Sequence, residues 1–95
     1  MRHKVRGRKL SRERDQRRLM FRNLLISLVE HERIATTLIK AKELRSIAER
    51  VITYGKKGEV HHRRLTYGIL QDRTMVKKVF DELAPRYNEV NGGYT

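Results

Sequence analysis

The side chains best suited to chemistry in this chain are cations, not nucleophiles or paired acids. Residues 1–18 contain nine Lys or Arg and two acidic residues, so they carry +7 of the formal net charge of +12. Guanidinium and ammonium groups at this density bind the phosphates of a polyanion through charge-assisted hydrogen bonds. The charge pattern therefore predicts a nucleic-acid partner first and an anionic membrane surface second.

The predicted RNA-binding residues form two groups. The first group follows the N-terminus and the start of the first predicted helix: Arg2, His3, Lys4, Arg6, Arg8, Lys9, Arg12, Arg14, Arg17, Arg18 and Arg22. The second group lies at the edges of later helices: Lys40, Lys42, Arg45, Arg63 and Arg64. Proteins that read single strands stack bases on clustered aromatic side chains, and the few aromatics here are scattered. Contacts with the phosphates and sugars of structured RNA or of a duplex fit the sequence better.

Neither enzymatic nor metal chemistry is expected. The chain has no cysteine, and it lacks a phosphate-cradling glycine loop and a Gly-x-Ser-x-Gly turn. His61 and His62 are adjacent and would point about 100° apart on a helix, while His31 lacks the His-x-x-x-His spacing of a zinc pair. We therefore expect no catalytic residue, no metal, no cofactor and no small-molecule substrate.

Membrane insertion and secretion are not expected either. No apolar run approaches the length of a membrane span. The charged N-terminus is not followed by the apolar segment of a secretory signal, although its Arg-rich composition also suits an organellar transit peptide.

The longest amphipathic segment, from Leu38 to Gly55, is the helix that must organise the protein body. Its apolar residues recur at helical spacing: Leu38, Ala41, Leu44, Ile47, Ala48, Val51 and Ile52. The polar–apolar alternation of residues 33–36 predicts a short strand before it, and Thr36 or Thr37 is expected to cap the helix. Gly55 is the expected residue at its C-terminal end.

Three further helices are predicted. Ser11 suits the N-cap of a first helix whose apolar face begins only near Phe21. A third helix is expected over residues 59–71, and Asp72 caps a fourth that Pro85 stops. The last ten residues carry strand-type side chains around an Asn-Gly-Gly turn signal, which is typical of a hairpin.

A chain of 95 residues makes one domain. Residues 1–18 are expected to form an extended basic arm that runs into the first helix, because they hold too few apolar residues to fold alone. Residues 19–95 are expected to form one compact, mostly helical α+β domain. Its C-terminal hairpin is expected to be truncated, since the sequence stops where a second strand would begin.

The helix pair over residues 59–83 leaves one alternative function open, a free nucleoid-type DNA-binding protein with a helix-turn-helix. The turn would fall near Gln71 and Asp72. The second helix offers three cations but also two acids, and it has few amide side chains with which to read bases.

Several motifs follow one another along the whole chain in a familiar order. They are Met1-Arg2-His3-Lys4, Gly7-Arg8-Lys9-Leu10, Arg22-Asn23-Leu24, the block from His31 to Arg45, Pro85-Arg86-Tyr87 and Gly92-Gly93-Tyr94-Thr95. This pattern resembles the bacterial large-subunit ribosomal protein L17 family, which also has mitochondrial and plastid members. Two departures are Asp15-Gln16-Arg17 in place of Ser-His-Arg, and Val90 in place of a usual Arg.

The resemblance implies a structural constituent of the large ribosomal subunit that binds and stabilises 23S-type ribosomal RNA. It implies an α+β fold of about four helices, with a short strand near residues 33–36 and a small C-terminal sheet completed by two further strands beyond Thr95. It also implies a place on the outer surface near the exit of the nascent-peptide tunnel, beside neighbouring ribosomal proteins. The ribosome would be that of a bacterial cytoplasm or of a mitochondrial or plastid matrix.

Overall fold

Local caps set both ends of α2 (Leu38–Lys57), the helix that runs through the middle of the protein. The computed structural model describes the backbone of residues 2–95 and the side chains of residues 14–95. Thr37 begins α2, because its side chain accepts a hydrogen bond from the Lys40 N–H at 3.4 Å. Gly58 ends it with a φ of +71°, and its N–H donates to the Tyr54 carbonyl at 3.0 Å. The threonine cap is confirmed.

The prediction that Gly55 ends this helix is wrong, because Gly55 lies inside α2 and is buried. A Cβ atom placed on Gly55 would lie 2.7 Å from Cβ of Ala84 and 3.2 Å from Cγ1 of Val79. The missing side chain therefore lets α2 approach the C-terminal part of the chain closely.

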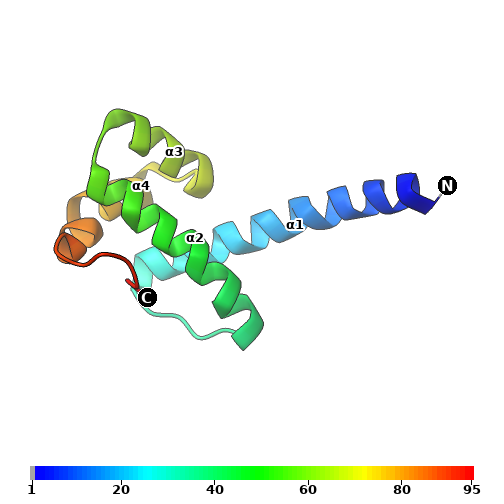
Figure 1. Ribbon diagram of the computed structural model, residues 1–95, viewed down its shortest axis with the longest axis horizontal. Helices are drawn as coiled ribbons and strands as arrows, with labels where there is room; N and C mark the ends of the chain where they lie inside the picture. Colours follow the sequence, from blue (N-terminus) through cyan, green and yellow to red (C-terminus); the bar gives the residue numbers. More distant parts are fainter. Residues whose placement is uncertain (1) are drawn as a thin grey trace.

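α1 (Arg2–His31) packs on the body with its C-terminal half, while its N-terminal half extends away from the other helices (Figure 1). Phe21, Leu25 and Val29 form its buried stripe. The expected extended arm is thus helical from Arg2, and Ser11 is not where the helix starts. Arg, Lys, Leu, Gln and Glu are good helix formers, and extending an existing helix is far easier than starting one.

α3 (Val60–Leu70) and α4 (Arg73–Lys78) are joined by a two-residue turn. Gln71 adopts a left-handed conformation, with a φ of +52°, and its N–H donates to the Tyr67 carbonyl at 2.7 Å. Asp72 caps α4 by accepting a hydrogen bond from the Met75 N–H at 3.1 Å. The third helix and the cap of the fourth are confirmed.

The helical backbone continues past Pro85, where the sequence predicted a stop. A π-helical turn, Val79–Leu83, follows α4 and leads into a 3₁₀ turn, Ala84–Tyr87. Proline is tolerated in the first turn of a helix because no hydrogen bond from its nitrogen is needed there. Pro85 occupies that position in the 3₁₀ turn.

No strand occurs in residues 2–95, so the predicted strand near 33–36 and the small C-terminal sheet are wrong for the described chain. Residues 33–36 have no partner strand in it to complete a ladder. The expected hairpin is replaced by a tail that folds back on α2. Tyr94 holds this tail, because its N–H donates to Glu49 Oε1 at 3.2 Å and its hydroxyl accepts from Lys56 Nζ at 3.0 Å.

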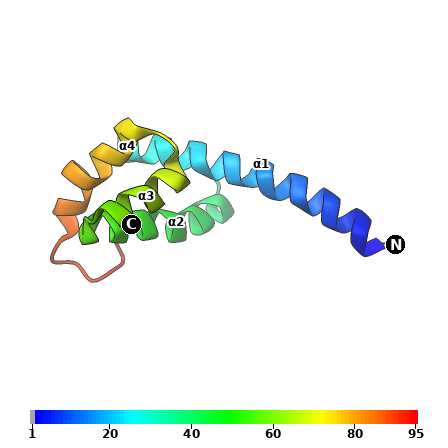
Figure 2. The ribbon, with the colours of Figure 1, turned by 90° about the horizontal axis from the view of Figure 1, so that it is seen from above.

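One hydrophobic core joins all four helices. α2 contacts α1, α3 and both turns after α4, and Figure 2 shows the N-terminal half of α1 clear of this body in a second view. The molecule measures 51 × 29 × 24 Å along its principal axes, and its long dimension reflects the projecting half of α1. None of the helices in the described chain combines the length and the apolar composition needed to cross a bilayer.

Candidate nucleic-acid interface

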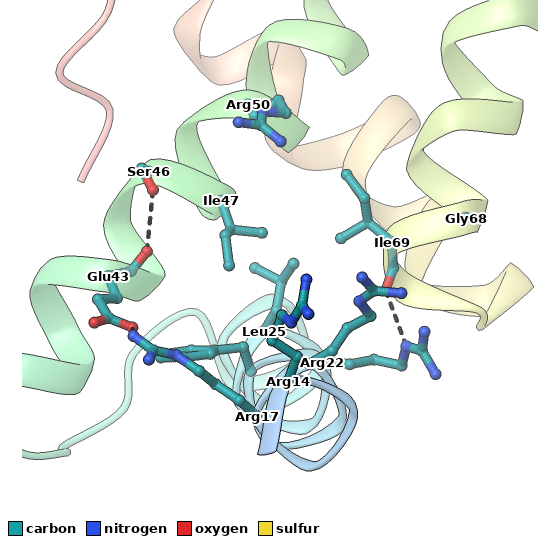
Figure 3. Close-up of a pocket in the computed structure, with 12 residues that line it drawn as sticks. Arg14, Arg17, Arg22, Leu25, Glu43, Ser46, Ile47, Arg50, Gly68 and Ile69 are labelled. Carbon is teal, nitrogen blue, oxygen red and sulfur yellow. Dashed lines mark hydrogen bonds and ion pairs between the residues drawn. The ribbon is translucent and has the colours of Figure 1, made fainter. Parts of the chain in front are cut away.

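Five arginines line one groove where α1, α2 and α3 meet (Figure 3). Four come from α1 and one from α2: Arg14, Arg17, Arg18, Arg22 and Arg50. The groove has a volume of about 610 Å³. Its lining also includes four apolar side chains, which we call the floor: Phe21, Leu25, Ile47 and Ile69. Among the described lining residues Glu43 is the only acid, so this arginine groove is strongly positive.

The helical repeat of α1 puts the arginines beside its buried stripe. Arg14, Arg18 and Arg22 are spaced by four residues and share one face of the helix. Phe21 and Leu25 lie on the adjoining face and point into the core. The basic face of α1 therefore runs along the margin of the core, at the point where α2 and α3 approach.

Arg22 ties α1 to α3. Its Nε donates a hydrogen bond to the Ile69 carbonyl at 3.1 Å, and the side chain is half-buried. Ile69 lies in the last turn of α3, where carbonyl groups have no partner within the helix and the helix dipole is negative. The bond thus fixes one guanidinium at the wall of the groove.

Arg17 forms an ion pair with Glu43 of α2 across the groove (Figure 3). Its guanidinium also lies 5.7 Å from the centroid of the Phe21 ring. Both partners of the ion pair are exposed to solvent, and such pairs contribute little to stability. A phosphate group could therefore replace Glu43 as the partner of Arg17 at low energetic cost.

Arg50 is the groove residue that the sequence did not identify. It is exposed and projects from α2 on the far side of the groove from α1 (Figure 3). Glu43, Ile47 and Arg50 follow one another at helical spacing, so their shared face was visible in the sequence. Nothing in the sequence showed that this face meets the basic face of α1.

Only part of the predicted interface comes together in the structure. Arg14, Arg17, Arg18 and Arg22 line the groove, whereas the cations predicted on the later helices lie outside it: Lys40, Lys42, Arg45, Arg63 and Arg64. Arg45 pairs with Glu49 at 3.2 Å within α2. The side chains of seven predicted residues fall outside the described residues: Arg2, His3, Lys4, Arg6, Arg8, Lys9 and Arg12.

The proposed recognition helix of the DNA-binding alternative is poorly placed for a duplex. α4 has six residues, and its Lys78 is turned toward the body. Lys78 Nζ donates to the Glu30 carbonyl at 2.8 Å and lies 3.5 Å from Glu32 Oε2. On α3, Arg63 is engaged by Asp81 at 3.3 Å. This geometry does not favour a helix-turn-helix reader.

A second ionic cluster locks the end of α1 to the C-terminal turns. Glu32, just after α1, accepts hydrogen bonds from Arg86 and pairs with Lys78. The Arg86 hydrogen bond and the charges of Arg86 and Lys78 lower the pKa of Glu32, while desolvation opposes them. The same carboxylate raises the pKa of Arg86. The cluster therefore joins the end of α1 to α4 and to the 3₁₀ turn.

The described side chains contain no group of three or more His, Asp or Glu that could hold a metal ion. The arrangement that they do form suits the binding of an anion.

Comparison with known proteins assigns the family. A family model described as ribosomal protein L17 matches residues 20–95. The large ribosomal subunit protein bL17 of Thermodesulfovibrio yellowstonii is 50% identical over 94 residues, which cover 99% of this chain and 71% of that protein. The bL17 protein of Dictyoglomus turgidum is 54% identical, with 99% and 81% covered. That of Erythrobacter litoralis is 54% identical, with 100% and 68% covered. The chain belongs to the ribosomal protein L17 family.

Proposed function

We propose that this chain is a structural constituent of the large ribosomal subunit and binds its 23S-type ribosomal RNA through α1 and the arginine groove. The L17 family consists of structural, non-enzymatic ribosomal proteins. One observation supports the proposed mode of binding: five arginines and, among the described lining residues, one acid converge in a groove at the base of a projecting basic helix.

The groove provides what a phosphate backbone requires. Arginine offers a planar fork of donors that matches phosphate oxygens, and it stays charged at all physiological pH values. Arg22 is pre-positioned by α3, and Arg17 exchanges a weak surface ion pair for a phosphate. Each phosphate neutralised in this way releases condensed counterions, which makes binding strong and dependent on salt.

The N-terminal half of α1 extends the same interaction. The sequence of residues 1–13 adds six Lys or Arg and one acidic residue, and α1 carries residues 2–13 away from the body (Figure 1). We propose that it follows the ribosomal RNA beyond the groove. The exposed cations Lys42, Arg45 and Arg64 offer weaker contacts at the edges of the body.

The protein's position on the ribosome is also a proposal. We place it on the outer surface near the exit of the peptide tunnel, in a bacterial or organellar ribosome, with neighbouring ribosomal proteins. Leu38 and Ile39, at the start of α2, are 70% and 74% exposed. Large apolar side chains in such positions suit a protein neighbour better than RNA phosphates.

Sedimentation tests this proposal. The chain is given an affinity tag and expressed in a bacterium from which the resident L17 protein has been depleted, and the lysate is separated on a sucrose gradient. At moderate salt we expect the tagged chain to migrate with the large ribosomal subunit and to be released as salt rises. Migration with chromosomal DNA, or as a free protein at moderate salt, would contradict the proposal.

A further inference from the structure

We infer that the arginine groove is a pocket for one unpaired nucleotide of RNA, whose phosphate contacts the guanidinium groups and whose base lies on the apolar floor. This inference rests on the proposed RNA-binding function and specifies what the groove takes from the RNA. It is carried by three features of the groove: its mixed chemistry, its size and the glycine in its wall.

The groove has two chemically different parts. Its rim holds five guanidinium groups, and its floor is formed by Phe21, Leu25, Ile47 and Ile69. A phosphate backbone that crossed the rim would satisfy the arginines and leave the two partly exposed residues of the floor, Ile47 and Ile69, facing water. An unpaired base supplies a flat, largely apolar face to cover such a floor, and proteins commonly recognise RNA through bases that are splayed out of a helix. A nucleotide is therefore the RNA component that matches both parts together.

The size of the groove also fits. Its volume of about 610 Å³ lies within the range of roughly 300–1,000 Å³ that small-ligand pockets occupy. The groove is bounded by three helices: Figure 3 looks along α1 below the groove, with α2 on one side and α3 on the other.

Gly68 keeps the wall of the groove open. It lies in the last turn of α3, and glycine is the weakest helix former other than proline. A Cβ atom added to Gly68 would meet no other atom within 4 Å, so no packing contact within the described protein explains the glycine. Because Gly68 lines the groove, its missing side chain leaves room for a ligand instead.

Glu43 sets the orientation of the nucleotide. Once a phosphate has replaced it as the partner of Arg17, Glu43, the only acid among the described lining residues, offers an acceptor to an exocyclic amino group of a base. The base is therefore expected toward Glu43 and Ile47, with the phosphate at the arginines of the rim.

The test fills the pocket without changing its charge. The probe is transcribed large-subunit ribosomal RNA, and the full chain is compared with Gly68→Leu and with the control His61→Leu, which adds a leucine to an exposed position of α3 outside the groove. Filter binding gives the affinity and its salt dependence, and base-specific chemical probing shows which unpaired bases are protected.

We expect the wild-type chain to protect at least one base that is unpaired and reactive in free RNA. Gly68→Leu should lower the affinity roughly tenfold, the size of one base contact, and should restore that base's reactivity while leaving the salt slope unchanged. His61→Leu should behave as the wild type. If Gly68→Leu binds and protects as the wild type does, the nucleotide pocket is wrong and the proposed function stands. If the wild-type chain shows no salt-dependent binding to the RNA, both are wrong.

Discussion

Gly55 and Gly68 are each the third-last residue of their helix, α2 and α3, and replacing each with alanine should affect stability differently. Both substitutions remove the same backbone penalty, because alanine is a better helix former than glycine by about 1 kcal/mol. They differ in what the new methyl group meets. At Gly68 it enters open space, whereas at Gly55 it would lie 2.7 Å from Cβ of Ala84.

The difference between the two variants isolates the cost of that contact, because the gain in helix propensity is common to both. Ala84 is 1% exposed, and its Cβ has no torsion through which to move aside. Overpacking of this kind typically costs about 1–3 kcal/mol. We therefore expect Gly68→Ala to raise the free energy of unfolding by up to about 1 kcal/mol, and Gly55→Ala to fall about 1–3 kcal/mol below it.

Thermal and urea unfolding, followed by circular dichroism, measure both variants against the wild type. Each kcal/mol shifts the Tm of a domain of this size by about 4–8 °C, so the two variants should melt at least about 4 °C apart. If Gly55→Ala stabilises the protein as much as Gly68→Ala does, then α2 does not pack on the C-terminal turns as described.

Three further predictions concern the junctions and the basic helix. The Arg86 hydrogen bond lowers the pKa of Glu32. The stability that this bond contributes is present above the ordinary carboxyl pKa of about 4.3 and is lost as pH falls through the lowered pKa. Between neutral and acidic pH, the free energy of unfolding in urea should therefore fall less for Glu32→Gln than for the wild type. Thr37→Ala should lower the free energy of unfolding by about 1 kcal/mol through loss of the α2 cap, and an unchanged urea midpoint would argue against that cap. Deleting residues 1–13, which hold six cations, should leave the thermal midpoint of the body nearly unchanged and reduce the salt slope of RNA binding by up to about 5 units; an unaltered slope would show that this segment does not contact the RNA.

Elements encoded by local chemistry could be predicted from the sequence. The helix from Leu38 follows from its apolar repeat. The caps Thr37 and Asp72 each lie three residues before the N–H group that donates a hydrogen bond to their side chain. The turn at Gln71 was equally local. Such features depend on neighbours along the chain, which a single sequence displays directly.

The errors concern contacts between distant segments. Gly55 matched the pattern of a helix end, but it serves a close approach to Ala84, 29 positions away. Residues 33–36 alternate like a strand, yet a strand forms only where a partner is present. The N-terminal arm was expected to be extended because it lacks a core, although its residues are individually good helix formers.

The candidate site was likewise predicted only in part. The basic face of α1 was visible from the spacing of Arg14, Arg18 and Arg22. The groove itself was not, because it exists only where three helices meet, and this is why Arg50 was missed. Lys40 and Lys42 have the right charge but lie outside the groove.

The salt dependence of binding to large-subunit ribosomal RNA tests most directly whether the arginine groove is the contact site. The double variant Arg18→Ala/Arg50→Ala is compared with Lys57→Ala/Arg73→Ala, which removes the same charge from exposed positions outside the groove. The groove variant should reduce the slope of log K against log salt by about 1.4–1.8 units, and the control should leave it nearly unchanged. Equal reductions in the two variants would show that binding depends on overall charge, and no reduction in the groove variant would show that the RNA does not enter the groove.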